Sequence, residues 1–246
     1  MKKLLLSVIL LVPFLAISQN KETRKLDAFT EVSVSQSIKL TLIKGSANTV
    51  EIITDGDLED VITDVSDEQL TVKKKSSWGI GNSDKVEVIV TYTEQLDELS
   101  ASSSSYLEIN DRLVTDDLEI SASSSASIKL VAKADDVEIS VSSSATVNAE
   151  IYAFELDATI TSSGSLYLEG NCDELEASAS SSGDLKANDF SAKRAELTCT
   201  SSAAISVFVQ DRLNASASSS GRIKYGGQPK NKSVETSSGG QIAPMD

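Results

Sequence analysis

The sequence predicts an all-β protein: a parallel β-solenoid of single-stranded coils, each about 19–20 residues long and right-handed. Three observations predict this fold. An eight-residue Ser-rich phrase recurs eight times at a nearly fixed period, the apolar residues beside it alternate with polar ones, and no stretch after residue 18 shows a 3.6-residue helical repeat. Chains with such a period bury a continuous core by stacking one coil on the next.

The phrase first occurs as SASSSSYL at Ser100–Leu107 and last as ETSSGGQI at Glu235–Ile242. Successive copies begin 21, 19, 19, 19, 20, 18 and 19 residues apart. Apolar residues at every second position flank each copy, and in the second copy they are Leu118, Ile120, Ala122, Ile128 and Leu130. This alternation is typical of a strand with one buried face, so each coil should hold two short strands joined by a Ser-rich corner.

Two places of the phrase are expected to point into the coil if the alternation continues around the corner. The sixth place is small in every copy, which would allow a sharp turn. The fourth place is serine in every copy and would form an internal ladder of bonded hydroxyl groups. These serines are Ser103, Ser124, Ser143, Ser162, Ser181, Ser201, Ser219 and Ser238. The first, third and fifth places would then form a flat outer stripe rich in hydroxyl groups.

The N-terminus has the pattern of a secretory signal peptide, which we place at residues 1–18. Two lysines precede an apolar run from Leu4 to Ile17, and small residues stand before a cleavage site at Gln19. The run is shorter than the roughly 20 residues that a membrane-spanning helix needs. We therefore expect an exported protein in the periplasm, on the outer surface or secreted, with no transmembrane segment after cleavage.

Residues 19–246 are predicted to form one β-solenoid domain. Residues 97–246 would supply eight Ser-rich coils, and residues 20–96 the N-terminal coils and cap. Weaker copies of the phrase begin at Glu31 and Glu51, 20 residues apart. Two alternating runs at 70–74 and 86–92, joined by a Gly-containing link around Trp78, predict either a hairpin or a longer coil with an excursion.

The chain is acidic, with a formal net charge of −15, which becomes −17 once Lys2 and Lys3 leave with the signal peptide. Such a chain is not drawn to nucleic acid by its charge. Acidic pairs stand at the connections between coils: Asp116-Asp117, Asp135-Asp136 and Asp173-Glu174. We expect them to be solvated turns; calcium binding is the weaker alternative, because their spacing is irregular, and we expect no metal.

Two cysteines in an exported chain can form a disulfide, but their places in the repeat argue against one. Cys199 takes the second place of its phrase, where the other copies have Ala, Val, Ile or Thr. It is therefore expected to be a small buried apolar residue. Cys172 lies between two phrases, in a different column.

The N-terminal run RKLDAFTEVSVSQSIKLTLIKG at residues 24–45 resembles the opening of the "putative auto-transporter adhesin, head GIN domain" family. The repeats SGSL (163–166), SGDL (182–185) and SGRI (220–223) are similar to that family's small-Gly-x-apolar repeats. The resemblance covers essentially the whole mature chain, although the Gly-Ile-Asn tripeptide is absent and Ile109-Asn110 is the nearest match. It implies a β-helix-like fold, export by a Bacteroidetes-type bacterium and a role in adhesion; it carries over no catalytic residues.

The chain contains no histidine, which excludes His-based triads, His metal sites and His acid–base catalysis. Its serines recur in every coil, a structural rather than a catalytic distribution. We therefore expect no enzyme, no catalytic residue and no cofactor. The leading hypothesis is an adhesion or scaffold protein with an unidentified surface partner, in an oligomeric state that the sequence leaves open.

The alternative is a carbohydrate-binding module that uses the hydroxyl stripe and scattered tyrosines, with Tyr167 and Tyr225 as the candidate glycan contacts. Ice binding is a third hypothesis, suggested by the flat stripe. It is disfavoured because the columns are mostly serine, whereas threonine suits that task better.

Overall fold

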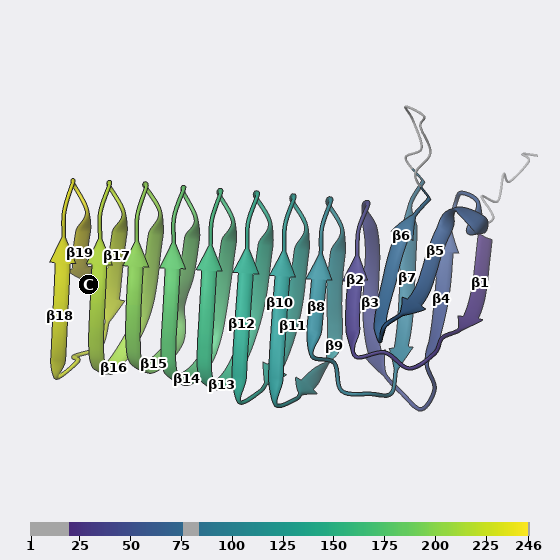
Figure 1. The fold of residues 1–246 in the computed structure, drawn as a ribbon, viewed down its shortest axis with the longest axis horizontal. Helices are drawn as coiled ribbons and strands as arrows, with labels where there is room; N and C mark the ends of the chain where they lie inside the picture. The colour runs from purple at the N-terminus through teal and green to yellow at the C-terminus, as the bar shows by residue number, and fades with distance from the viewer. Residues whose placement is uncertain (1–19, 76–83, 246) are drawn as a thin grey trace, which may run out of the picture.

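Parallel strands stacked along one axis make up most of the structure (Figure 1). This computed structural model describes residues 20–75 and 84–245. The predicted signal peptide and the link around Trp78 lie outside the described residues. Over these described residues the chain is all-β apart from one short 3-10 helix, η1 (Leu58–Asp60), and it forms a β-solenoid. The predicted fold class is therefore confirmed.

Each coil has a front strand, a Ser-rich corner and a back strand. The strands before β13 are β1 (Asn20–Lys25), β2 (Glu31–Val34), β3 (Ile38–Lys44), β4 (Thr49–Thr54), β5 (Val61–Ser66), β6 (Gln69–Lys74), β7 (Val86–Tyr92), β8 (Glu98–Ala101), β9 (Tyr106–Val114), β10 (Asp117–Ala122), β11 (Ser127–Lys133) and β12 (Asp136–Val141). They are followed by β13 (Thr146–Ile160), β14 (Ser165–Ala179), β15 (Asp184–Cys199), β16 (Ala204–Ala217), β17 (Arg222–Gly226), β18 (Asn231–Thr236) and β19 (Gln241–Pro244).

Two sheets enclose the core. The front sheet contains β8, β10, β12, the second halves of β13 to β16, and β18; the back sheet contains β9, β11, the first halves of β13 to β16, β17 and β19. In Figure 1 the chain climbs the front, crosses the corner and descends the back while it advances to the left, which is a right-handed coil.

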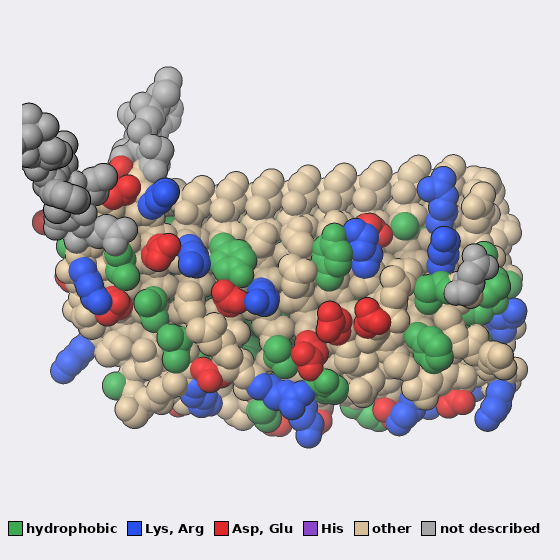
Figure 2. All heavy atoms as spheres, turned by 180° about the vertical axis from the view of Figure 1, so that it is seen from behind, with side chains coloured by type: hydrophobic (Ala, Val, Ile, Leu, Met, Phe, Trp, Pro, Cys, Tyr) green, Lys and Arg blue, Asp and Glu red, His purple; other side chains and the backbone are tan. Residues whose placement is uncertain are grey.

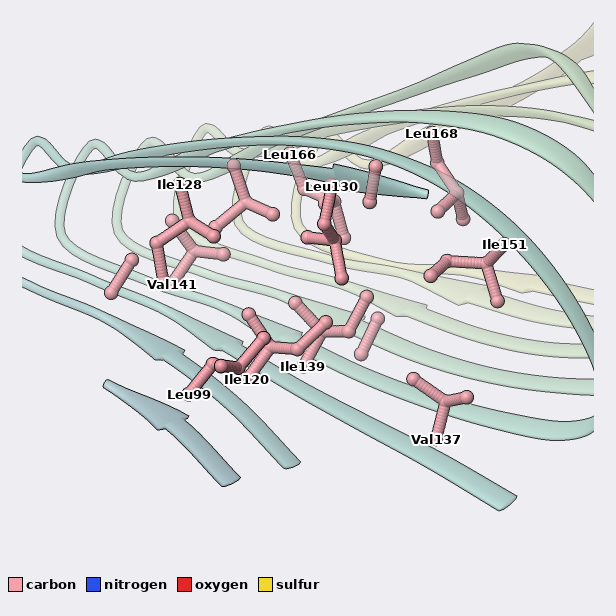
Figure 3. Close-up of a cluster of buried hydrophobic side chains, with 14 of the residues drawn as sticks. Leu99, Ile120, Ile128, Leu130, Val137, Ile139, Val141, Ile151, Leu166 and Leu168 are labelled. Carbon is pink, nitrogen blue, oxygen red and sulfur yellow. The ribbon is translucent and has the colours of Figure 1, made fainter. Parts of the chain in front are cut away.

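Inward-facing apolar side chains stack in register along the axis. Ile120 and Ile139 are paired across β10 and β12, and Leu118 is paired with Val137 in the same way. Figure 3 shows Ile120, Ile139 and Val137 pointing into the space between the two layers. All four are almost completely buried. Because each coil repeats the alternation at the same register, every added coil extends one apolar core.

The corners differ from the sequence prediction. The fourth and fifth residues of each phrase have a left-handed backbone conformation with positive φ, as in Ser124 (φ 52°) and Ser125 (φ 62°). The amide of Ala126 donates to the carbonyl of Ser123 at 3.1 Å, which closes a two-residue turn of the I′ kind. The amide of Ser125 donates to the carbonyl of Ser143 in the next coil at 3.0 Å.

The predicted inward serine ladder is therefore wrong in direction, because alternation stops where two consecutive residues are left-handed. The fourth-place serines lie at exposed turn tips: Ser103, Ser124, Ser143, Ser162, Ser181, Ser201, Ser219 and Ser238. Their backbone carbonyls accept the amide hydrogen bonds that join each corner to its neighbour. The sixth place faces inward as predicted, and it is buried in the first seven copies of the phrase.

The N-terminal region does not follow chain order. The coil of β2 and β3 lies between the coil of β8 and β9 and the coil of β6 and β7. Among the described residues, β6 pairs with β2 and β5, and β7 pairs with β3 and β4, so the two runs do not form the hairpin alternative. They lie in the two sheets of one coil, and the predicted excursion between them lies outside the described residues. The segment beginning at Glu51 is not a further coil, because β4 pairs antiparallel with β1 and β7. β5 pairs antiparallel with β6.

Candidate functional surfaces

The front sheet presents a column of stacked carboxylates, which we call the carboxylate ladder. Strand register places one acidic side chain on each of seven successive strands. The ladder consists of Glu31, Glu98, Glu119, Glu138, Asp157, Glu176 and Glu196. Like charges placed directly opposite one another in a sheet oppose its formation. The fold alone therefore does not account for this column.

A second acidic column runs beside the ladder through Asp117, Asp136, Glu155 and Glu174. A groove of about 510 Å³ lies over both columns from Glu31 to Asp157. The second column ends at Glu174, which pairs with Arg194. Among the described residues, the ladder carboxylates from Glu98 onward form no ion pair, so the front face keeps its charge.

Glu98 shows the electrostatic consequence most clearly. Partial burial raises the pKa of its carboxyl group above the ordinary value, and the nearby charges of Glu31, Glu119 and Asp97 raise it further. Both effects disfavour the ionised form.

The back face is chemically different. Several of its charges form ion pairs: Lys129 lies 3.0 Å from Glu108 of the neighbouring coil, and Lys186 lies 3.1 Å from Asp184 of its own strand. Figure 2 shows basic, acidic and apolar side chains mixed over this face, below an upper edge that is almost entirely uncharged turn tips. The two broad faces thus offer different surfaces: the front is predominantly acidic from Glu31 to Glu176, and the back is mixed.

The two candidate glycan contacts are not brought together. Tyr167 points outward from β14 and is 40% exposed. The ammonium of Lys186 lies 2.9 Å from its hydroxyl group and 4.5 Å from its ring centre. Tyr225 lies in β17 and is only 7% exposed, because it is in register with the buried Val207 of the inward column. Its ring is not a surface platform, so that assignment is corrected.

Both cysteines are buried and free, and Cys199 faces inward between Ala179 and Ala217, as its place in the phrase predicts. Burial raises the pKa of the Cys172 thiol to about 12, with help from Asp173 and Glu174. Burial also raises the pKa of Cys199. Both thiols therefore stay protonated at neutral pH, and a protonated thiol is a poor nucleophile.

No group of three or more His, Cys, Asp or Glu side chains within the described ranges is placed to hold a metal ion. The stacked acidic pairs therefore lie side by side rather than around a common point.

Sequence reasoning missed the carboxylate ladder, although a signal for it exists. An acidic residue stands two positions before each of the first six phrases, from Glu98 to Glu196. The period of these residues is that of the phrase, so they had to share a column once the coils stacked.

The chain belongs to the family described as "Putative auto-transporter adhesin, head GIN domain", whose profile matches residues 28–150 and 131–229. The resemblance found in the sequence is thus confirmed. None of the curated proteins is detectably similar to this chain in sequence.

Several solved structures share the fold. A "putative adhesin" from Parabacteroides merdae is 23% identical with a TM-score of 0.87, over 93% of this chain and 96% of the other. A "putative adhesin" from Parabacteroides distasonis is 21% identical with a TM-score of 0.83, over 93% and 97%. A "putative lipid binding protein" from the same species is 24% identical with a TM-score of 0.78, over 92% and 97%. Across residues 20–75 and 84–245, no helix is long and apolar enough to cross a membrane.

Proposed function

We propose that this protein is exported and acts outside the cytoplasm as a non-enzymatic adhesion or scaffold protein, displayed on the cell surface or held in the periplasm. Membership of an adhesin-like family supports the adhesive role. The observation that carries the proposal is the front face, where one outward pattern of carboxylates repeats over successive coils. Solenoids commonly use such extended surfaces for binding.

The front face is the binding face in this proposal. Its stacked like charges oppose folding, so they need a reason other than stability. A uniformly charged surface attracts oppositely charged partners and repels similar ones, which gives selectivity at long range. The back face pairs part of its charge, and its own acidic column is shorter, running only through Glu150, Glu169 and Asp189.

Cell attachment tests the proposal. A strain lacking the protein is restored with the wild type, with a front variant (Glu119→Gln, Glu138→Gln, Asp157→Asn) or with a back control (Glu108→Gln, Glu150→Gln, Glu169→Gln). Attachment is counted on wells coated with mucin, collagen or fibronectin. We expect the strain without the protein to attach less on at least one coating, and the wild type and back control to restore it.

The front variant should restore attachment only weakly. Unchanged attachment without the protein on all coatings would contradict adhesion. Full restoration by the front variant would contradict the role of the carboxylate ladder.

Glycan binding is a second candidate, supported by Tyr167. Its half-exposed ring stands between Asn148 and Lys186 in one outward column of the back face, so hydrogen-bonding groups flank an aromatic surface. Residues 20–246 applied to a glycan array should bind a sugar, Tyr167→Ala should abolish that binding, and Phe208→Ala, which removes an exposed aromatic ring from another coil, should not. The idea fails if the wild type binds no glycan.

A further inference from the structure

The tail of the solenoid places a charge in a column that is apolar in the six preceding coils, from Leu118 to Leu213. Lys232 of β18 is in register with Leu213, and that inward column continues through Ala195 and Leu175. Leu213 is completely buried. The Lys232 ammonium lies 3.0 Å from the Tyr225 hydroxyl group and 5.4 Å from its ring centre. The side chain therefore reaches from the front sheet to the back sheet across the end of the core.

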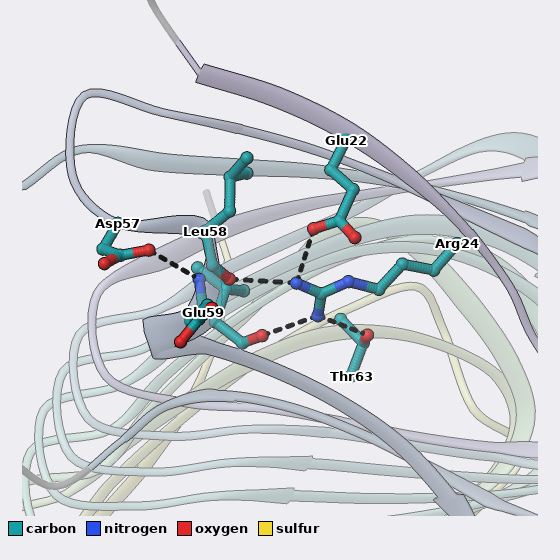
Figure 4. Close-up of polar contacts among 7 residues, drawn as sticks. Glu22, Arg24, Asp57, Leu58, Glu59 and Thr63 are labelled. Atoms are coloured by element: carbon teal, nitrogen blue, oxygen red, sulfur yellow. Dashed lines mark hydrogen bonds and ion pairs between the residues drawn. The ribbon is translucent and has the colours of Figure 1, made fainter.

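The head of the solenoid has the same kind of closure. Arg24 of β1 is in register with the buried Val50, on the inward side of the back sheet. Its guanidinium donates to the carbonyl of Val61 at 2.7 Å and to that of Leu58 at 2.9 Å, and it pairs with Glu22 at 2.7 Å (Figure 4). Here too a charged side chain bridges the two sheets over the apolar core.

The tail strands otherwise have the features of a pairing site. In the part of the chain that the structure describes, β18 pairs only with β16, and β19 pairs only with β17. All six residues of β18 are exposed, and Val234, which faces the core end, is 44% exposed. Open edges of this kind recruit further strands unless a charge or a proline blocks them. Pro244 in β19 supplies no amide hydrogen for such pairing.

We propose that Lys232 is an end guard, which prevents a second copy of this chain from joining the tail of the solenoid. A copy that met it tail to tail would run its β18 antiparallel to this one and continue the apolar column. Lys232 would then be enclosed by apolar residues. Its ammonium group would lose its hydration without gaining a carboxylate as an ion-pair partner, which disfavours the association. Arg24 and Glu22 guard the head in the same way, so the protein stays a finite rod. This inference does not depend on the adhesive role.

Sedimentation velocity over a concentration series tests the guard on residues 20–246. The Lys232→Val variant should self-associate at least tenfold more tightly than the wild type. Its particles should be no larger than two copies, because the head keeps its own guard. Amide exchange in β18 should slow as the dimer forms. The matched control is Lys224→Val, which removes a lysine that points outward from the neighbouring β17, and it should behave as the wild type.

A second variant separates the charge from the Lys–Tyr contact. Lys232→Glu loses the bond to Tyr225 but keeps a charge in the column, so it should remain monomeric. Lys232→Met should associate as Lys232→Val does, which covers the case in which valine disturbs folding. The proposal is overturned if both apolar variants stay monomeric. It is also overturned if Lys224→Val or Lys232→Glu associates as strongly as they do.

Discussion

Gly170 allows a sharp test of how tightly the coils stack. It lies in β14, where φ is +107°, and a Cβ atom there would stand 2.1 Å from the carbonyl oxygen of Ile151 in the preceding coil. Gly170→Ala therefore adds two penalties, a left-handed backbone with a side chain and an overlap with backbone atoms. Neither can be relieved without separating two hydrogen-bonded coils.

The magnitude follows from these two terms. The backbone conformation costs about 1–2 kcal/mol for a residue with a Cβ atom, and the overlap costs about 1–3 kcal/mol. Alanine also restricts the unfolded chain more than glycine does, and this stabilises the folded state by about 0.4–1 kcal/mol. The net loss is about 2–4 kcal/mol, which for a chain of this size lowers Tm by about 5–15 °C.

Gly239 provides the matched control. It also has a positive φ, +78°, but a Cβ atom there would meet only the Ser220 hydroxyl oxygen, at 3.7 Å. The other seven corners carry serine at this place. Gly239→Ala should therefore lower Tm by less than about 5 °C, since only the backbone term acts. Thermal unfolding followed by circular dichroism compares the two variants, and equal losses would refute the argument from close stacking.

Three further predictions concern single groups. Ser105→Ala should lower the free energy of unfolding, measured by chemical denaturation, by about 1 kcal/mol, because the Ser105 hydroxyl group donates hydrogen bonds to the carbonyls of Val34 and Ser102. An unchanged free energy of unfolding would mean that these hydrogen bonds are not made. Because the folded pKa of Glu98 is raised, its protonated form favours folding, and that stabilisation is lost as pH rises through the folded pKa. Glu98→Gln should therefore raise Tm at pH 7 but not below about pH 4. An equal rise in Tm at the two pH values would contradict the raised pKa of Glu98. The thiols of Cys172 and Cys199 should resist a thiol reagent at pH 8 until the protein is denatured; fast labelling of the native protein would contradict their burial.

The repeated coils could be predicted because local pattern and global fold agree there. The alternation around Ile120 and Ile139 defines an inward face, and a fixed period then sets the register of every neighbour. Cys199 is placed correctly for the same reason, since its column is fixed by its position in the phrase.

The corners were mispredicted because alternation holds only for extended backbone. Ser124 and Ser125 are both left-handed, so two residues turn outward together and the next one, Ala126, returns to the inward face. Nothing in a run of serines distinguishes this two-residue turn from a continued strand. Only the last corner, Ser238-Gly239, has glycine in the turn itself, where it signals such a turn.

The N-terminal order could not be predicted because strands of the same period are interchangeable in a sequence pattern. β2 is equally compatible with a neighbour on either side, and only the structure shows β6 and β8 flanking it. Tyr225 was misplaced for a related reason. A tyrosine near the tail looks exposed, but its position two residues after Ile223 puts its ring on the inward face.

The adhesive role requires that the rod be displayed outside the cell, and surface labelling tests this most directly. Intact cells are treated with an amine-reactive biotin reagent that does not cross membranes. The exposed side chains of Lys129 and Lys193 offer reactive amines on the folded protein. We predict that the protein is labelled in intact cells while a periplasmic marker is not. Labelling only after the envelope is permeabilised would contradict surface display and with it direct adhesion.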